Sequence, residues 1–405
     1  SSGATRLEES FTYDSVGNLK TRVDTASRTT AYDYDQLNRL KKITDALNGQ
    51  TQFEYDSRSN LTKVKDAANQ EYIYTYDPLG RVLTETHAGT TMSFEYDAVG
   101  NRKKRTDHMG RVTDYTYDAL NRLTNIEYNG GANNPVPDSQ AAYSYDELSR
   151  LVSAVNNAGT VSFTYDTRDR LKTETDVFGH VVEYGYDAGN RRTTMKLDSA
   201  SYATYAYDIA NRLTGITNAS DSATINFSYD NANRLTSRTY PNGVATNYEY
   251  DGMSRLKRIK DDGPSSTLFD RQYSYNDANQ ISQIADLTGT KVFGYDNLDR
   301  LTSMTNGVTN ESYAFDAVGN RISSHLSSSY SYSPFNRLSS TQTSTQNFDA
   351  DGNTIRKSEG SSFWRYTWNY ENRLTGADTR KDKVRYIYDA LGRRVMRKAG
   401  PKGFT

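Results

Sequence analysis

Aromatic and polar residues alternate along this chain in short stretches that recur throughout its length. In Phe53-Glu54-Tyr55 and Tyr74-Thr75-Tyr76, two rings flank one smaller or charged residue. This spacing places both rings on one face of a β-strand, because successive side chains of a strand point to opposite faces. No apolar pattern of helical period persists for ten residues anywhere in the sequence, so we expect almost no helix.

The aromatic pair is followed by Asp and recurs with a period of about 21 residues. The first six anchor residues are spaced by 21, 21, 21, 20 and 21 residues: Tyr13, Tyr34, Tyr55, Tyr76, Tyr96 and Tyr117. Counting degenerate copies, 19 units cover nearly the whole chain, and only Gln346 breaks the rule of an aromatic residue two positions before the anchor. A fixed period of this size is typical of repeat proteins, in which a unit buries its face only against its neighbours.

Two turn signals divide each unit into two short strands. Four residues after every anchor stands Gly, Asn, Ser or Asp, as at Gly17 and Asn38, and these residue types tolerate turn conformations. The Asp that follows the anchor can accept backbone N–H groups across the same turn. A second signal, such as Asp45–Gly49 or Pro241–Gly243, closes many units. The sequence therefore predicts a run of antiparallel β-hairpins with strands of about six residues.

The second strand of a unit has a less regular pattern. Leu40 and Ile43 stand three positions apart, which fits neither face of a regular strand. A β-bulge or a strong local twist would reconcile the two positions. We therefore predict an irregularity in this pairing.

The repeats run on without a clear domain boundary. We interpret residues 1–10 as a lead-in, residues 11–398 as one continuous array of about 19 units and residues 399–405 as a tail. We interpret the departures from regular spacing as changes in loop length rather than as linkers between domains. They fall at three places: 129–135, 263–266 and 323–346.

Composition explains how such an array can bury surface. The chain has 33 Tyr and no Cys, so we expect phenol rings to replace the missing aliphatic side chains as buried surface. The balance of 49 basic and 50 acidic residues excludes the basic footprint of a nucleic-acid-binding protein. No stretch approaches the roughly 18 apolar residues of a membrane span.

Two variants of the turn carry a resemblance to a known family. Residues 96–102 are Tyr-Asp-Ala-Val-Gly-Asn-Arg, and residues 117–123 are Tyr-Asp-Ala-Leu-Asn-Arg-Leu. These segments resemble the YD repeats of the Rhs family, which includes bacterial Rhs polymorphic toxins, wall-associated proteins, the C components of insecticidal Tc toxins and animal teneurins. The resemblance covers residues 11–398 and implies an all-β fold, in which a spiral of antiparallel hairpins forms part of a large hollow shell.

The same resemblance implies containment. In the bacterial toxins the shell encloses a C-terminal toxin domain, whereas in teneurins it is a cell-surface scaffold. We therefore expect a non-catalytic, secreted or surface-located shell segment of a bacterial toxin system, whose partners are a polypeptide toxin cargo or the rest of its parent protein. The alternative is a cell-surface adhesion array that binds glycans and holds no cargo. The chain has no initiating Met and no toxin domain, so we expect it to be a piece of something longer.

Residues suited to catalysis or metal binding are scarce. The absence of Cys removes disulfides, thiol catalysis and Cys-based zinc sites. Motifs of phosphate loops, zinc proteases and serine hydrolases are missing as well. We therefore predict no catalytic, metal-binding or cofactor-binding residue and no enzyme activity. The four His residues lack the spacing of a metal site, and we expect them at separate turn or surface positions: His87, His108, His180 and His325.

Three local motifs have ordinary interpretations. Asp349–Asn353 resembles the start of a calcium loop, but it fits the repeat, and Gly360 stands where the loop needs Glu. Asp77–Gly80 matches half of the self-cleavage motif that the family resemblance suggests, yet it occupies an ordinary turn of the repeat. Residues 380–402 carry nine Lys and Arg, for which a solvated surface is the default interpretation.

The repeat also predicts how a wall is held together. We expect the rings of neighbouring units to stack across strands. Asp and Arg at fixed offsets should form a ladder from turn to turn, with Arg also lying over a Tyr ring. Unpaired backbone at the two ends predicts either cover by the parent protein or end-to-end association. Small and polar residues at the alternate strand positions are expected to line a wet cavity that holds an unfolded or partly folded guest: Thr12, Glu54, Thr75, Glu95, Thr116, Gly185 and Ala206.

Overall fold

The computed structural model describes residues 9–129 and 140–401, and every regular element in these ranges is a β-strand. The predicted all-β class is thereby confirmed. Most of the lead-in at residues 1–10, most of the loop at 129–135 and part of the tail at 399–405 lie outside the described residues. A search of the described residues for a helix able to span a membrane finds none.

Strands β1–β30 form one antiparallel sheet and β31–β38 form a second. Within each sheet, every strand pairs with the next one along the chain, as β2 does with β3 and β3 with β4. The strands of the larger sheet are β1 (Ser10–Tyr13), β2 (Leu19–Val23), β3 (Thr29–Tyr34), β4 (Leu40–Thr44), β5 (Gln50–Tyr55), β6 (Leu61–Lys65), β7 (Glu71–Tyr76), β8 (Val82–His87), β9 (Thr90–Tyr96), β10 (Arg102–Thr106), β11 (Val112–Tyr117), β12 (Leu123–Asn129), β13 (Gln140–Tyr145), β14 (Leu151–Asn156), β15 (Gly159–Tyr165), β16 (Leu171–Thr175), β17 (Val181–Tyr186), β18 (Arg192–Leu197), β19 (Ala200–Tyr207), β20 (Leu213–Asn218), β21 (Thr224–Tyr229), β22 (Leu235–Thr239), β23 (Ala245–Tyr250), β24 (Leu256–Asp262), β25 (Thr267–Tyr275), β26 (Ile281–Asp286), β27 (Gly289–Tyr295), β28 (Leu301–Thr305), β29 (Asn310–Phe315) and β30 (Arg321–Ser324). The strands of the smaller sheet are β31 (Tyr330–Ser333), β32 (Arg337–Thr341), β33 (Ser344–Phe348), β34 (Thr354–Glu359), β35 (Ser362–Trp368), β36 (Leu374–Asp378), β37 (Asp382–Tyr388) and β38 (Arg394–Pro401).

Each hairpin carries a bulge beside its anchor. Tyr34 pairs with Leu40 and Asp33 pairs with Lys42, so Lys41 has no residue opposite it. The same shift recurs in the other units, and the predicted irregularity is confirmed. Asn38, four residues after the anchor, has a φ of 60°, which is the conformation that the turn pattern predicted.

The two faces of the ribbon differ in burial. In β5, Phe53 and Tyr55 are half-buried, whereas Gln52 and Glu54 are exposed. Both rings therefore share one face, as their spacing predicted. We call this the aromatic face, defined by the anchor residue and the aromatic residue two positions before it.

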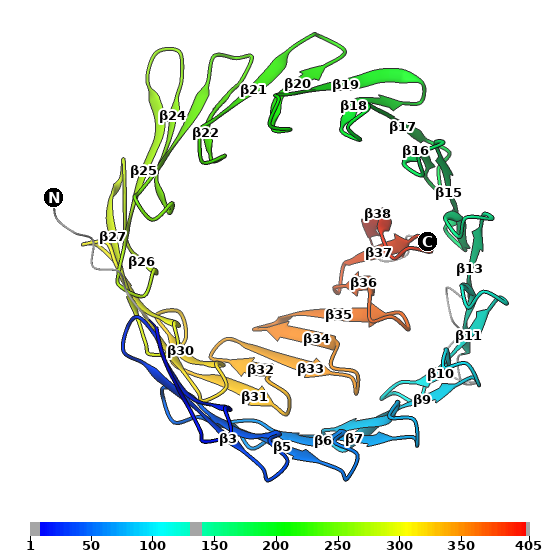
Figure 1. Ribbon diagram of the computed structural model, residues 1–405, viewed down its shortest axis with the longest axis vertical. Coiled ribbons are helices and arrows are strands. Elements are labelled where there is room, and N and C mark those ends of the chain that lie inside the picture. Colours follow the sequence, from blue (N-terminus) through cyan, green and yellow to red (C-terminus); the bar gives the residue numbers. More distant parts are fainter. Residues whose placement is uncertain (1–8, 130–139, 402–405) are drawn as a thin grey trace.

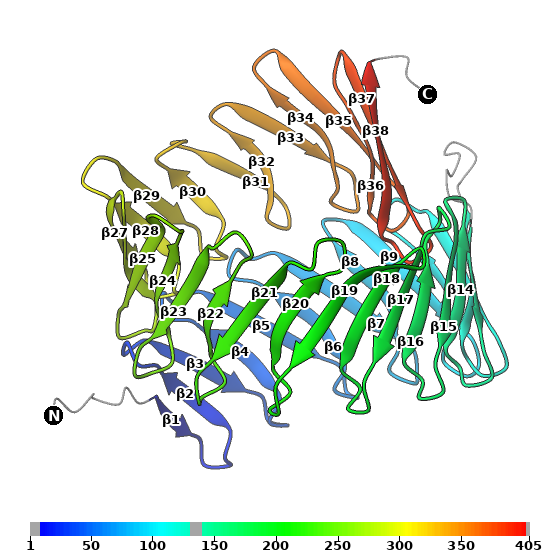
Figure 2. The same cartoon turned by 90° about the horizontal axis from the view of Figure 1, so that it is seen from above.

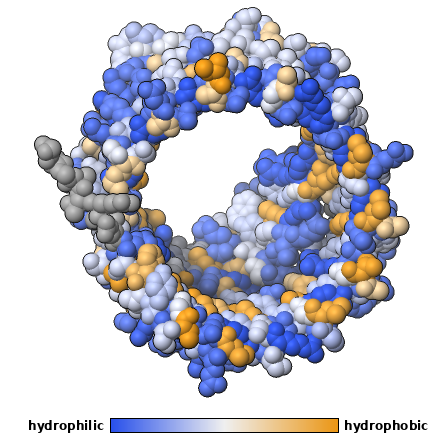
Figure 3. Space-filling view, viewed as in Figure 1, coloured by the Kyte–Doolittle hydropathy of each residue, from blue (hydrophilic) through white to orange (hydrophobic). Residues whose placement is uncertain are grey.

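The larger sheet bends into a ring one strand layer thick (Figures 1 and 3), and the ring surrounds an open interior. It closes where the turn between β2 and β3 meets the turns that follow β25 and β27. The Thr25 hydroxyl donates to the Asp277 carbonyl over 3.1 Å, across a sequence separation of 252 residues. Arg28 pairs with Asp299 at 2.5 Å in the same place. One turn of the spiral therefore takes about 12 repeats of about 21 residues.

The smaller sheet begins a second coil. Between β30 and β31, Ser324 and Ser327 form a single bridge, and the Tyr332 hydroxyl donates to the Arg321 carbonyl over 2.8 Å. Seen down the ring, β31–β38 lie within its outline (Figure 1), and the perpendicular view places them beyond its edge (Figure 2). The ribbon thus winds inward and along the axis, which confirms the hairpin spiral.

The buried core is small and lies largely where the coils meet. Ile126, Ala141 and Ala154 of the ring form one buried cluster with Ala390 of the second coil. Tyr115 and Tyr143 of the ring pack against this cluster. A single-layer sheet cannot bury its own face, so contact with another coil supplies its core.

Candidate functional site: the turn ladder and the seam between the coils

Most anchors are followed by an Asp that organises the turn. Asp208 Oδ1 accepts the backbone N–H groups of Ala210 and Arg212, both over 2.9 Å. Its Oδ2 accepts the Arg212 Nε–H over 2.7 Å. These bonds, chiefly those from Arg212, hold the pKa of Asp208 below its ordinary value. The predicted acceptance of backbone N–H groups by this Asp is confirmed.

The Arg of one turn reaches the next turn along the ribbon. Arg212 Nη1 donates to the Asp230 carbonyl and to Asn233 Oδ1, each over 3.0 Å. Its guanidinium also lies 4.9 Å from the centre of the Tyr229 ring. The predicted Asp–Arg ladder, with Arg over Tyr, is therefore confirmed. The same arrangement of Arg over the next anchor ring recurs along the wall: Arg39 over Tyr55, Arg81 over Tyr96, Arg122 over Tyr145, Arg150 over Tyr165, Arg170 over Tyr186, Arg191 over Tyr207, Arg234 over Tyr250, Arg255 over Tyr275, Arg300 over Phe315 and Arg337 over Phe348.

The anchor rings do not stack on one another. The Tyr229 hydroxyl donates to the Leu213 carbonyl of the preceding unit over 2.8 Å, and most anchors make the same bond. Among the described residues, ring–ring contacts join other aromatic pairs, such as Tyr128 with Tyr370, and never two successive anchors. The prediction of stacked anchor rings is therefore wrong, because an Arg guanidinium lies against the ring wherever the preceding turn supplies one, as at Tyr229.

A buried charged cluster joins the two coils at the turn between β10 and β11. Arg111, 8% exposed, pairs with Asp107 over 2.6 Å and with Asp351 of the second coil. The Arg111 guanidinium also lies 4.9 Å from the centre of the Tyr370 ring. Burial raises the pKa of Asp351, and the nearby charge of Asp107 raises it further. Asp351 Oδ1 accepts the backbone N–H of His108 over 3.1 Å. This carboxylate of the calcium-like segment Asp349–Asn353 therefore bonds across the contact between the two coils.

Next to this cluster, the rings of His87 and His108 lie together, although the two residues are far apart in the sequence. The centres of the His87 and His108 rings are 4.1 Å apart, and Phe335 of the second coil lies 4.5 Å from His87. Burial lowers the pKa of His87, and the charge of His108 lowers it further. The expectation of separate turn or surface positions is wrong for this pair, although their spacing of 21 residues, one repeat, could have indicated it. His180 is exposed and bonds Asp198 over 2.8 Å, and His325 lies edge-on to Tyr313.

Farther along, the seam between the coils is apolar with a few directed hydrogen bonds. The Tyr143 hydroxyl donates to the Ala390 carbonyl and Asn156 Nδ2 donates to the Tyr388 carbonyl, both over 2.9 Å. Ile126 and Ala154 lie opposite Tyr115 and Tyr143 in register, so they belong to the aromatic face. The second coil, which lies within the ring's outline, therefore contacts the aromatic face (Figure 1).

This contact bears on what lines the interior. Thr116, one of the alternate positions expected to line the cavity, pairs with Asn125 on the opposite face of the ribbon. Where the second coil meets the ring, the prediction of a lining built from alternate positions is therefore wrong. The inward face there carries the aromatic residues.

The remaining motifs behave as turns or ion pairs. Asp77 Oδ1 accepts the N–H groups of Leu79 and Arg81, and Oδ2 pairs with Arg81 over 2.6 Å, which confirms an ordinary turn. In the basic C-terminal stretch, Arg393 pairs with Asp389 and with Glu174 of the ring. Over residues 9–129 and 140–401, no group of three or more His, Asp or Glu has the arrangement of a metal site.

Comparison with known proteins places this architecture in a family. A family model described as the teneurin YD-shell matches residues 3–84, 59–219 and 288–402, and an RHS repeat model matches residues 227–265. The chain belongs to the teneurin YD-shell family. The bulged hairpins, the turn Asp residues and the inter-turn Arg residues described above are thus features of a YD-shell chain.

Two kinds of relative add context to the YD-shell assignment. The chain is 32% identical over 135 residues to a protein named double-stranded DNA deaminase toxin A from Burkholderia cenocepacia, a match that spans 31% of this chain and 10% of that protein. The crystal structure of TcdB2-TccC3-Cdc42 matches with a TM-score of 0.78 and 15% identity over 96% of this chain and 26% of that one. The Photorhabdus luminescens Tc holotoxin pore matches with a TM-score of 0.59 and 13% identity over 98% of this chain and 27% of that one. At these identities the solved structures show a shared fold, and this chain spans only a small part of each relative.

Proposed function

We propose that this chain is a non-catalytic wall segment of a secreted bacterial toxin shell that encloses a polypeptide cargo. The observation that carries the proposal is the closed ring around an open interior (Figure 3). The ring returns onto itself through Thr25 after 252 residues and through Arg28 after 271, and a second coil continues on its inner side. A wall one layer thick that winds in this way encloses volume rather than building a solid core.

The relatives support a toxin setting. The curated relative is named a toxin, and the solved relatives belong to Tc toxin complexes. In the described residues, the turn Asp, the inter-turn Arg and the anchor Tyr hold the wall together. Their polar atoms form the hydrogen bonds of the ladder. We assign no chemical step to these groups, because their bonds are directed at neighbouring turns.

The adhesion array remains the alternative proposal, but the structure favours it less. Sugars bind proteins by stacking on free aromatic faces. In the wall, an Arg guanidinium already lies 4.4–5.6 Å from the centre of each anchor ring named above as having an Arg over it. A glycan array probed with the isolated chain addresses this alternative directly. Specific glycan binding that is lost on substitution of wall Tyr residues would favour adhesion.

The test of containment uses the full-length protein that carries this wall. We expect polypeptide enclosed by the shell to resist limited proteolysis, and Arg111→Ala, which opens the buried seam, to expose it. Arg212→Ala is the matched control, since it removes a ladder Arg and leaves the contacts between coils in place. Cleavage that is equally fast in the unmodified protein and in Arg111→Ala would overturn the proposal.

A further inference from the structure

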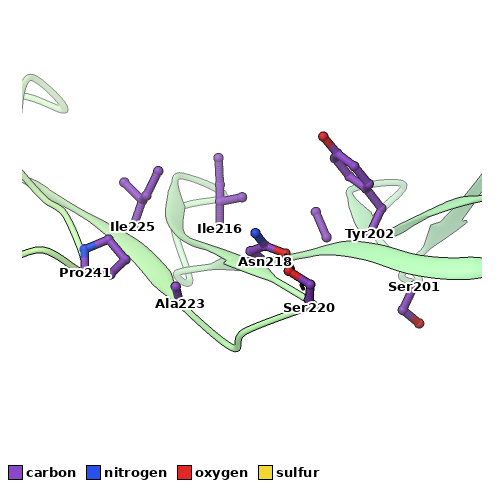
Figure 4. A pocket seen from close by; sticks show the side chains of 9 residues that line it. Ser201, Tyr202, Ile216, Asn218, Ser220, Ala223, Ile225 and Pro241 are labelled. Carbon is purple, nitrogen blue, oxygen red and sulfur yellow. Dashed lines mark hydrogen bonds between the residues drawn. The ribbon is translucent and has the colours of Figure 1, made fainter.

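An apolar pocket lies on the ring edge beyond the reach of the second coil. It has a volume of about 400 Å³ and opens between β19, β20, β21 and the turn after β22. Tyr202, Ile216 and Ile225 point to one side of the ribbon there, and Ser201 points to the other (Figure 4). Tyr202 is 55% exposed, which is high for an aromatic residue among apolar neighbours.

The pocket repeats the covered seam position by position. Ile216 is the third residue after Leu213, as Ala154 is the third after Leu151. Likewise, the buried Ala203 stands four residues before its anchor, which is the place of the seam residue Ala141. The side chains of β12–β14 that contact the second coil thus have counterparts in β19–β21. In the described structure, no second coil contacts these counterparts.

The polar contact has a counterpart as well. Asn156 Oδ1 accepts the Ala158 N–H over 3.0 Å, which leaves Nδ2 to donate to the Tyr388 carbonyl across the seam. Asn218 occupies the same place at the end of β20, and its Oδ1 accepts the Ser220 N–H over 2.9 Å. Asn218 Nδ2 donates to no atom of the described residues, and in Figure 4 it faces the same side as Ile216.

We propose that this pocket is the docking site for the Tyr-Asp turn of a YD-repeat hairpin that adds to the free edge of β38. The apolar positions would pack against the residue after the Asp, as the ring's cluster packs against Ala390. Asn218 Nδ2 would donate to the carbonyl of the anchor Tyr, as Asn156 does.

Continuity of the seam identifies this occupant. The second coil meets the ring at Asp351 with Arg111, then at Ala390 with Tyr143, then at Arg393 with Glu174. As the second coil proceeds along the chain, its partners in the ring therefore lie progressively closer to β19–β22. Within the described residues β38 pairs only with β37, whereas the second strand of every earlier hairpin except β30 also pairs with the hairpin that follows. Further hairpins on this edge would carry their Tyr-Asp turns to the pocket.

The test uses a single thiol, because the chain has no Cys of its own. Asn218→Cys places the thiol in the pocket, Asn156→Cys places it in the covered seam, and Ser201→Cys places it on the opposite side of the ribbon (Figure 4). In the chain as it stands, we expect maleimide to modify Asn218→Cys as fast as Ser201→Cys, and Asn156→Cys about tenfold more slowly.

The chain is then extended by a copy of its residues 9–87, four hairpins, joined after Thr405. We expect modification of Asn218→Cys to slow about tenfold, with Ser201→Cys unchanged. Adding Ile216→Asp should restore the fast rate, whereas Val308→Asp, at a residue 91% exposed, should not.

Three results would overturn the assignment. In the first, the added hairpins gain amide protection but Asn218→Cys stays fast. In the second, the added hairpins gain no protection, which means that β38 does not accept a YD-repeat hairpin. In the third, the unextended chain protects Asn218→Cys in a concentration-dependent way, which identifies a second copy as the occupant.

Discussion

Arg212 and Arg111 each follow an Asp by four residues in a turn, yet they hold different parts of the molecule together. Arg212 reaches the next turn of the ribbon, 18 residues away at Asp230. Arg111 lies at the opposite edge of the ribbon and reaches Asp351, 240 residues away. The first contact is part-buried and repeats along the wall, whereas the second is buried and joins two coils. One local motif therefore serves two purposes, and what lies against the Arg, the next turn of the ribbon or another coil, decides which.

The largest expected effect is at the buried seam charge. Arg111→Ala leaves Asp107 and Asp351 buried without their cation, and breaking such a pair costs about 3–5 kcal/mol. We expect amides of β31–β38 to lose protection in hydrogen exchange while those of β17–β27 keep theirs. Arg212→Ala, the same change in the ladder, should affect only adjacent strands. Equal loss over both regions would mean that the ladder and the seam do not differ.

The apolar part of the seam should give the next largest effect. Ile126→Ala removes three carbons from the cluster that holds Ala390, and such a truncation costs about 2–5 kcal/mol. Thermal unfolding and exchange of β36–β38 measure the loss. Ile209→Ala is the matched control, because Ile209 is fully exposed in a turn and its truncation should change little. A similar loss in both variants would show that burial at the seam is not what stabilises the second coil.

Acid should loosen the seam near its His pair. Because the pKa of His87 is lowered in the fold, the unfolded ring binds a proton first as pH falls. The stability that the neutral ring contributes is present above the ordinary pKa of 6.5 and is lost as pH falls below it, through the lowered folded value. Besides His108, the charges that act on His87 are those of Glu85 and Arg337, and Tyr72 and Phe335 pack around the rings. The Asp351 carboxylate bonds the backbone N–H of His108. We expect protection of β31–β32 to decrease as pH falls below about 6.5, through the lowered pKa of His87.

Two variants separate this effect from general acid sensitivity. His87→Phe keeps a ring of similar size in the cluster and should flatten the dependence on pH. His180→Phe is the control, because the bond to Asp198 raises the pKa of exposed His180. Its contribution has the opposite sign, being present below pH 6.5 and lost as pH rises through the raised value. A dependence that survives His87→Phe would assign the acid effect to another group.

The same contrast explains how much the sequence could predict. The ladder joins residues four and about 20 positions apart, so a period of 21 was enough to predict the Asp–Arg contacts, the bulge and the turns. The stacking of rings was predicted wrongly, because the strand pattern places rings on one face but does not say that Arg212 lies against Tyr229. The seam depends on how strongly the ribbon curves, and no local pattern fixes that curvature. Neither the contact of Arg111 with Asp351 nor the pocket at Ile216 could therefore be predicted.

The smallest expected effect tests whether the repeats contribute independently to the free energy of unfolding of the wall. Tyr229→Phe removes the hydroxyl that donates to the Leu213 carbonyl over 2.8 Å, and losing one such bond costs about 1 kcal/mol. The wall already tolerates this change at Phe315, an anchor without a hydroxyl whose ring still lies 5.0 Å from the Arg300 guanidinium. Exchange measured strand by strand should show the loss confined to β20–β22, because these strands contact only neighbouring strands of the ribbon in the described structure. A loss as large as that of Ile126→Ala, spread around the ring, would instead mean that closure makes the whole ring one cooperative unit.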